Sequence, residues 1–155
     1  SDEGEGAPLL SVYGGKITTY RHLAEEAVNL LAARLPALTG KAWTASRCLP
    51  GGEVGIDGIA ELVAELRAKH PFLGDAETLR IARAYGTRAH DWLGDARQRG
   101  DLGRDFGHGL SQAEVDYLVI AEWAQTAEDV LWRRTKLGLH LDPAQQAALA
   151  DYLGG

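Results

Sequence analysis

The chain has 155 residues, of which 45% are hydrophobic and 25% charged, and this composition predicts an ordinary globular domain with one core. The formal net charge of −6 leaves no broad basic field, so nucleic acid is excluded as an expected partner. A single cysteine, no recognisable signal peptide and no apolar run near the roughly 18 residues that span a bilayer predict a reducing, cytoplasmic setting.

The first residues of the chain look like the last part of a larger folded domain. It opens on a polar, glycine-rich stretch without an initiator methionine, and we expect residue 1 to be a cut. Residues 9–13 form a short apolar run that predicts a strand end, stopped by Gly14 and Gly15. Nothing else in the first half of the chain supplies the partner strands that a sheet needs. We therefore expect the rest of that sheet to lie upstream of residue 1.

A long amphipathic helix is predicted after the glycine turn. Thr18 or Thr19 is suited to cap its start, and Pro36 marks its end. We interpret residues 1–40 as a strand–turn–helix remnant of one domain, and residues 41–56, which contain Pro and Gly without a clear period, as a connector. The apolar positions at helical spacing are Tyr20, Leu23, Ala24, Ala27, Leu30, Leu31 and Leu35.

Residues 57–155 predict an all-α domain of about six short helices, so the whole chain is expected to be mainly α. Ser111 and Glu114 have capping-box spacing, and Asp142 is a cap that precedes a proline at the first helical position. Short connections predict that successive helices are antiparallel neighbours. The helices are expected to begin at Asp57, Asp75, Thr87, Ser111, Thr126 and Asp142, with Pro71 and Gly86 ending the first two.

The first candidate site is the turn Gly-Gly-Lys-Ile-Thr-Thr at residues 14–19. A helix start offers unpaired N–H donors and the positive end of the helix dipole, and glycine lets a ligand approach the backbone closely. The turn has neither the P-loop spacing nor the G-x-G-x-x-G pattern of a dinucleotide fold. From these residues alone, a tight turn before a capped helix is the commoner interpretation.

The second candidate is the basic cluster at residues 131–136, Leu-Trp-Arg-Arg-Thr-Lys. Cations near a helix C-terminus complement its dipole, and Asp129 and Arg133 are an i,i+4 pair of the favoured orientation. Trp132 among apolar neighbours is more often a packing anchor than a stacking platform. We therefore interpret this cluster as structural.

Other reactive side chains give no complete catalytic constellation. Cys48 stands in the connector without a partner histidine, and an idle thiol is expected. Carboxylates such as Asp101, Asp105 and Asp116 stand at helix starts or in loops, where capping is their commoner role. No metal site is predicted, because the histidines are far apart in the sequence: His22, His70, His90, His108 and His140.

Several motifs resemble, in the right order, the C-terminal region of FAD-dependent glycerol-3-phosphate dehydrogenases. Single short motifs carry little weight, but an ordered set across residues 9–153 is specific. The matching segments are residues 10–21 (LSVYGGKITTYR), 48–52 (CLPGG), 85–86 (YG), 102–107 (LGRDFG) and 127–139 (AEDVLWRRTKLGL).

This resemblance implies a parent enzyme that oxidises sn-glycerol 3-phosphate to dihydroxyacetone phosphate by hydride transfer to FAD, and passes the electrons to quinone. The chain would then be a helical cap domain preceded by the last part of the flavin domain. In that family the corresponding turn lies against the flavin ring, which makes Gly14, Gly15, Lys16, Ile17 and Thr18 candidate cofactor-binding residues. Lys16 is also the candidate for binding the substrate phosphate.

The resemblance also implies what this chain lacks. The N-terminal dinucleotide fold and the family's substrate-binding Arg and His residues are absent, so the chain alone is expected to bind no FAD and to be inactive. The parent is expected at the cytoplasmic face of the cell membrane as a peripheral protein. Two alternatives remain: a helical interaction or dimerisation module, which includes a homo-oligomer, and a related flavoenzyme with another electron acceptor.

Overall fold

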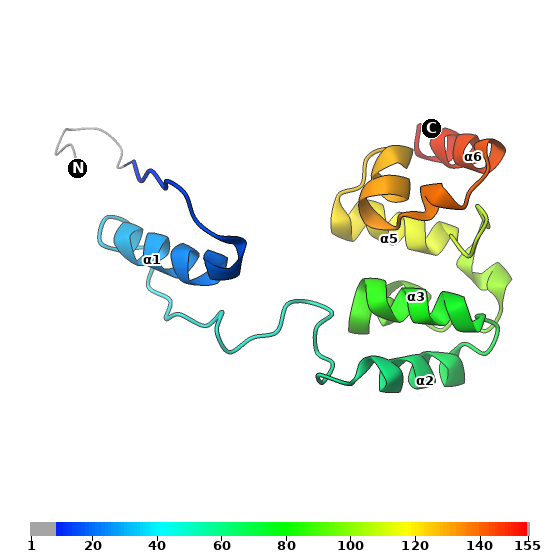
Figure 1. Cartoon of the computed structure of the whole chain (residues 1–155), viewed down its shortest axis with the longest axis horizontal. Coiled ribbons are helices and arrows are strands. Elements are labelled where there is room, and N and C mark those ends of the chain that lie inside the picture. Colours follow the sequence, from blue (N-terminus) through cyan, green and yellow to red (C-terminus); the bar gives the residue numbers. More distant parts are fainter. Residues whose placement is uncertain (1–8, 155) are drawn as a thin grey trace. The chain divides into compact units, whose positions relative to one another are not determined.

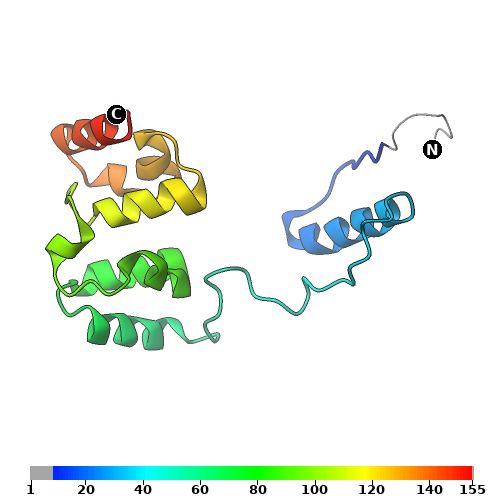
Figure 2. The same ribbon diagram turned by 180° about the vertical axis from the view of Figure 1, so that it is seen from behind.

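The computed structural model describes residues 9–154, and the chain divides after Cys48 into two compact units (Figure 1, and Figure 2 from behind). Both units are helical, and the described residues contain no strand, only an isolated bridge between Asp105 and Ser111. The prediction of a mainly α fold is confirmed. Among residues 9–154, no helix is long and apolar enough to cross a bilayer.

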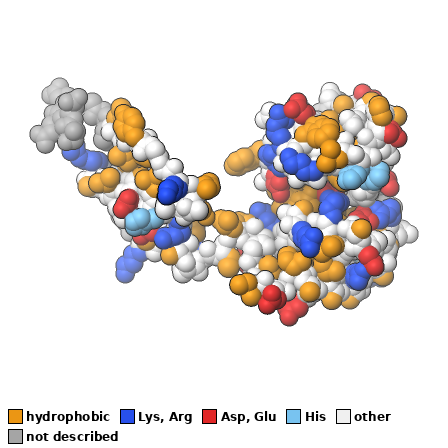
Figure 3. Space-filling model, in the orientation of Figure 1, with side chains coloured by type: hydrophobic (Ala, Val, Ile, Leu, Met, Phe, Trp, Pro, Cys, Tyr) orange, Lys and Arg blue, Asp and Glu red, His pale blue; other side chains and the backbone are white. Residues whose placement is uncertain are grey.

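The first unit contains the 3₁₀ turn η1 (Ile17–Thr19) and helix α1 (Tyr20–Ala32). The predicted strand at residues 9–13 is wrong for this structure, because these residues have no regular secondary structure and no described segment offers them a partner. No residue of α1 is buried, and Leu30 is 64% exposed. Figure 3 shows hydrophobic side chains on the surface of this unit. Its apolar face is therefore uncovered within the described part of the chain.

The second unit holds the remaining helices, and in both ribbon views α2 and α3 lie side by side at one end, with α6 at the other. Five α-helices and one π-helical turn account for the six predicted helices after residue 56. The α-helices are α2 (Ile59–Lys69), α3 (Asp75–Tyr85), α4 (Ala89–Leu93), α5 (Gln112–Glu122) and α6 (Pro143–Gly154). The shorter elements are the 3₁₀ turns η2 (Gly86–Arg88), η3 (Arg99–Leu102) and η5 (Leu137–Leu139), and the π-helix η4 (Asp129–Arg134).

One hydrophobic core joins the elements of the second unit. Every α-helix in it, and also η4, contributes at least one side chain that is at most 1% exposed, and burial of each such side chain contributes about 1.5–3 kcal/mol. The division after Cys48 falls inside the segment interpreted as a connector, residues 41–56. One such residue from each of α2, α3, α4, α5, η4 and α6 is, in that order, Leu66, Ile81, Leu93, Leu118, Val130 and Leu149.

The predicted capping signals are mostly confirmed. The Ser111 hydroxyl accepts a hydrogen bond from the backbone N–H of Glu114 at 3.3 Å, and Asp142 Oδ1 accepts one from the N–H of Gln145 at 2.9 Å. Asp57 does not cap α2, since Gly58 takes that position without a side-chain bond. Residues 55–58 form a tight turn, in which the Gly58 N–H donates to the carbonyl of Gly55 at 2.9 Å. The predicted helix after Thr126 is a π-helical turn, because the Thr135 N–H bonds five residues back, to Val130.

Candidate functional site

The predicted cofactor-binding residues lie together on one exposed turn before α1. Gly14 and Gly15 have φ values of 74° and 120°, which favour glycine. The Lys16 carbonyl accepts two hydrogen bonds from Thr19, from its N–H at 3.0 Å and its hydroxyl at 3.1 Å. Thr19 therefore folds the turn onto its own backbone instead of capping α1 with its side chain. Ile17 and Thr18 are the first residues of the helical segment, where backbone N–H groups have no intrahelical partner.

This turn is open to solvent. A Cβ at Gly14 would meet no atom within 4 Å, so a planar group has access to the backbone there. Ile17 is 85% exposed, which is high for a large apolar side chain. Lys16 is exposed, and within residues 9–154 its ammonium forms no ion pair. The geometry suits an electron-rich or anionic group placed at the helix start.

The basic cluster at residues 131–136, most of which lies within η4, is held by the fold itself. Arg133 donates to Asp129 at 2.9 Å, as the spacing predicted, and to Glu128 at 2.8 Å. Arg134 donates to the carbonyl of Glu122 at 2.8 Å. Trp132 packs over Gly138 but is 40% exposed, so it anchors η5 without being a fully buried core residue. The structural interpretation of this cluster is supported.

A buried ionic cluster, which the sequence did not reveal, joins α3 to α5. Glu114 is fully buried and accepts from Arg80 Nη1 and Nη2, at 2.6 and 2.8 Å, and from the Tyr85 hydroxyl at 2.5 Å. Burial and the neighbouring Glu114 carboxylate raise the pKa of Tyr85 far above its ordinary value. The capping-box spacing located the helix start correctly, but the Glu114 side chain binds across the core instead of closing the box.

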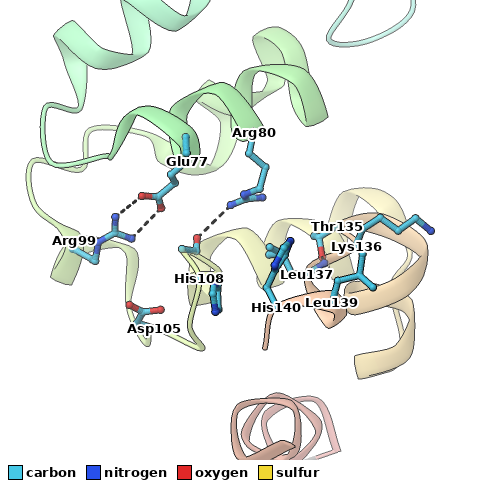
Figure 4. A pocket seen from close by; sticks show the side chains of 12 residues that line it. Glu77, Arg80, Arg99, Asp105, His108, Thr135, Lys136, Leu137, Leu139 and His140 are labelled. Carbon is cyan, nitrogen blue, oxygen red and sulfur yellow. Dashed lines mark hydrogen bonds and ion pairs between the residues drawn. The ribbon is translucent and has the colours of Figure 1, made fainter. Parts of the chain in front are cut away.

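Beside this cluster, the second unit has a pocket of about 550 Å³ between α3, the loop before α5 and η5 (Figure 4). One wall carries the bidentate pair of Arg99 and Glu77, with N–O distances of 2.5 and 3.0 Å. On the other side the imidazoles of His108 and His140 lie with their ring centroids 5.5 Å apart. The lining residues are Ala76, Glu77, Arg80, Arg99, Asp105, His108, Gly109, Thr135, Lys136, Leu137, Leu139 and His140.

The histidine pair is a tertiary feature that sequence spacing could not show, because each imidazole comes from a different loop. It does not amount to a metal centre: the described residues contain no group of three or more His, Cys, Asp and Glu side chains placed to hold a metal ion. Cys48 is exposed and free, and its setting gives no sign of an activated thiolate.

Comparison with known proteins defines the class of this helical chain. Residues 42–152 match the family model described as the C-terminal domain of alpha-glycerophosphate oxidase, and the chain belongs to that family. More particularly, it is 50% identical over 146 residues to a glycerol-3-phosphate dehydrogenase of Pseudomonas aeruginosa, covering 94% of this chain and 28% of the relative. It is 45% identical over 152 residues to the aerobic glycerol-3-phosphate dehydrogenase of Escherichia coli, covering 98% and 30%.

A third relative carries another substrate in its name. The D-erythritol 1-phosphate dehydrogenase of Brucella abortus is 44% identical over 151 residues, covering 97% of this chain and 30% of the relative. The resemblance inferred from the ordered motifs is confirmed. The chain spans less than a third of the length of these relatives, and it matches their C-terminal part.

Proposed function

We propose that this chain is the C-terminal part of an FAD-dependent dehydrogenase that oxidises sn-glycerol 3-phosphate to dihydroxyacetone phosphate. The observation that carries the proposal is the match of nearly the whole chain, at 45–50% identity, to two dehydrogenases named for glycerol 3-phosphate. The proposed electron acceptor is quinone, and the proposed location is the cytoplasmic face of the cell membrane.

In this proposal the turn at residues 14–18 forms one edge of the flavin site. When bound, FAD supplies the hydride acceptor, and the protein positions it. The glycine turn, which is open at Gly14, and the helix start fit the electron-rich pyrimidine edge of a flavin, because N–H donors and the helix dipole stabilise negative charge there. Lys16 would add its positive charge beside the flavin or bind the substrate phosphate.

A direct test uses the enzyme with its flavin domain and compares Lys16→Ala with the matched control Lys41→Ala, which removes another exposed lysine. Loss of one charge from a preorganised site typically costs about 10²–10³ in rate, so kcat/KM should fall by about that factor for Lys16→Ala only. Both variants should keep the flavin absorbance and the melting temperature of the wild type. Unchanged kcat and KM in flavin-loaded Lys16→Ala enzyme would refute the placement of this turn.

The substrate is tested in the same assay. The erythritol phosphate relative is nearly as similar to this chain as the Escherichia coli enzyme, at 44% against 45% identity, so the second candidate activity is oxidation of a longer polyol phosphate. Comparing kcat/KM for sn-glycerol 3-phosphate and D-erythritol 1-phosphate decides between them. Replacing the quinone analogue by dissolved oxygen separates a dehydrogenase from an oxidase.

The 155-residue chain alone is expected to be colourless and inactive, because hydride transfer also needs a bound flavin, a phosphate clamp and a proton acceptor. The uncovered face of α1 supports packing against the rest of the enzyme or a second copy of the chain. Sedimentation of the isolated chain at two concentrations tests the second possibility. A monodisperse monomer with a fully solvated α1 at both concentrations would contradict self-association.

A further inference from the structure

The pocket of the second unit contains two kinds of ionisable side chain: arginine and lysine cations that already have partners, and two histidines that have none within residues 9–154. Arg99 is bound by Glu77, and Arg80 is bound by the buried Glu114. The Lys136 ammonium donates to the carbonyl of Trp132 and points away from the histidines in Figure 4. The cations on the walls are thus already engaged.

His108 and His140 differ from the other histidines of the chain. The rings of His22, His70 and His90 each have a polar partner: Glu26, the Ala96 carbonyl and Glu65, respectively. Within residues 9–154 the imidazoles of His108 and His140 have none, and their closest ring contact is with each other, at 5.5 Å. Both side chains are exposed and line a pocket with a volume typical of small-molecule sites.

The backbone around this pair is also unusual. His108 and Lys136 are two of the three non-glycine residues with positive φ in residues 9–154, at 49° and 61°, and both line the pocket. Such conformations cost free energy and are concentrated where a ligand or a catalytic group must be positioned. Here they place the two loops so that the imidazoles meet.

We propose that this pocket binds a small organic phosphate, with the phosphate group held between the imidazoles of His108 and His140 and the carbon part against Leu137 and Leu139. A tetrahedral anion accepts hydrogen bonds from two imidazolium rings at once and relieves their mutual repulsion. Both leucines line the pocket, Leu137 as a buried side chain and Leu139 as an exposed one. The site is separate from the turn at residues 14–18, and the inference does not depend on the proposed oxidoreductase activity.

Binding at this site depends on pH, because an imidazole donates from both nitrogens only when protonated. The charged groups that line the pocket beside the pair are Glu77 and Arg80 from α3, Arg99 from η3 and Asp105 from the loop, whereas Lys136 before η5 points away from the pair. Because Glu114 neutralises Arg80 and Glu77 neutralises Arg99, protonation of the two rings adds positive charge that the wall residues do not supply. Affinity for anions is therefore greater when both rings are protonated.

The test is isothermal titration of the 155-residue chain with sodium sulfate, whose charge is constant over this range, at about pH 6 and about pH 8 in chelator-containing buffer. Saturable one-site binding at least about tenfold tighter at the lower pH is expected. His108→Gln and His140→Gln should each lose about tenfold or more in affinity. The matched control His90→Gln, which removes a histidine elsewhere in the same unit, should bind like the wild type.

A second titration at the lower pH compares sn-glycerol 3-phosphate with glycerol. The phosphate ester should bind at least as tightly as sulfate and should compete with it, and glycerol should not bind. Circular dichroism checks that each glutamine variant is folded, and the ring resonances of His108 and His140 report occupancy directly. Absent saturation, equal affinity at both pH values, or unchanged affinity in both glutamine variants would overturn the proposal.

Discussion

Gly86 tests how the last part of the connector, around Gly51, is attached to the helices of the second unit. It ends α3 with φ 55° and ψ −138°, a conformation that only glycine adopts without strain, and a Cβ there would lie 1.8 Å from the Gly51 carbonyl oxygen. Gly94 ends α4 with nearly the same backbone, φ 52° and ψ −125°, but its Cβ would meet nothing within 4 Å. Gly94→Ala is therefore a matched control that has the backbone strain without the clash.

The expected magnitude follows from this difference. Backbone strain alone should lower the unfolding free energy of both alanine variants by about 1–3 kcal/mol. Gly86→Ala must also displace Gly51, which breaks the 3.1 Å bond from the Thr87 N–H to the Gly51 carbonyl and disturbs the 2.7 Å bond from the Thr87 hydroxyl to Glu53. At about 0.5–1.5 kcal/mol for each net hydrogen bond, the extra loss is about 1–3 kcal/mol.

Thermal melts followed by circular dichroism measure this loss. At about 4–8 °C per kcal/mol for a domain of this size, Gly86→Ala should melt about 5–20 °C below Gly94→Ala. Gly51→Ala changes the other residue of the same contact, because its Cβ would lie 2.5 Å from the Tyr85 carbonyl oxygen. This variant should also be destabilised. Equal melting temperatures for Gly86→Ala and Gly94→Ala would refute the idea that this contact fastens the segment.

Three further predictions concern the second unit. Glu114→Ala removes the buried partner of the partly buried Arg80 and should cost about 3–5 kcal/mol in urea unfolding. Glu128→Ala breaks a surface pair and should cost less than about 1 kcal/mol, and similar losses for the two variants would contradict this reasoning. Burial raises the pKa of Tyr85, so the unfolding free energy that this residue contributes is fully present below about pH 10 and decreases above it, where the tyrosine of the unfolded chain ionises. Thermal melts across that range should therefore show a smaller loss of stability at high pH for Tyr85→Phe than for the wild type. Trp132→Ala should cost about 1–2 kcal/mol, less than the roughly 3–5 of a fully buried residue, because the ring is 40% exposed.

The helices were predictable because their signals are local. Ser111 and Asp142 are capping residues with short side chains, and a capping bond depends only on residues three positions apart. The limits of such signals appear at the end of α5, where the predicted apolar stripe included Trp123. That residue takes the left-handed conformation with φ 58° and is 82% exposed, because the helix ends there and its side chain leaves the buried face.

The strand at residues 9–13 was not predictable in the same way, because a strand is stable only when other segments satisfy its backbone. The apolar run correctly marked residues that avoid helix, and the glycines correctly marked the turn, but the described residues offer no partner. The same reasoning explains why α1 has no buried residue: its stripe from Tyr20 to Leu31 shows amphipathic spacing, and spacing alone supplies nothing to pack against.

The two candidate sites differ in how the chain builds them. The turn before α1 is contiguous, so its glycines, lysine and helix start were visible as one motif in residues 14–19. The pocket is assembled from α3, a loop and η5, so its histidines come together from distant parts of the sequence. The pairs Arg80–Glu114 and Arg99–Glu77 join α3 to α5 and to η3 in the same region. Glu114 takes part in both local and long-range contacts: its backbone N–H donates to the Ser111 cap, and its side chain pairs with Arg80. A site made of such long-range contacts becomes visible only when the packing of the whole unit is known.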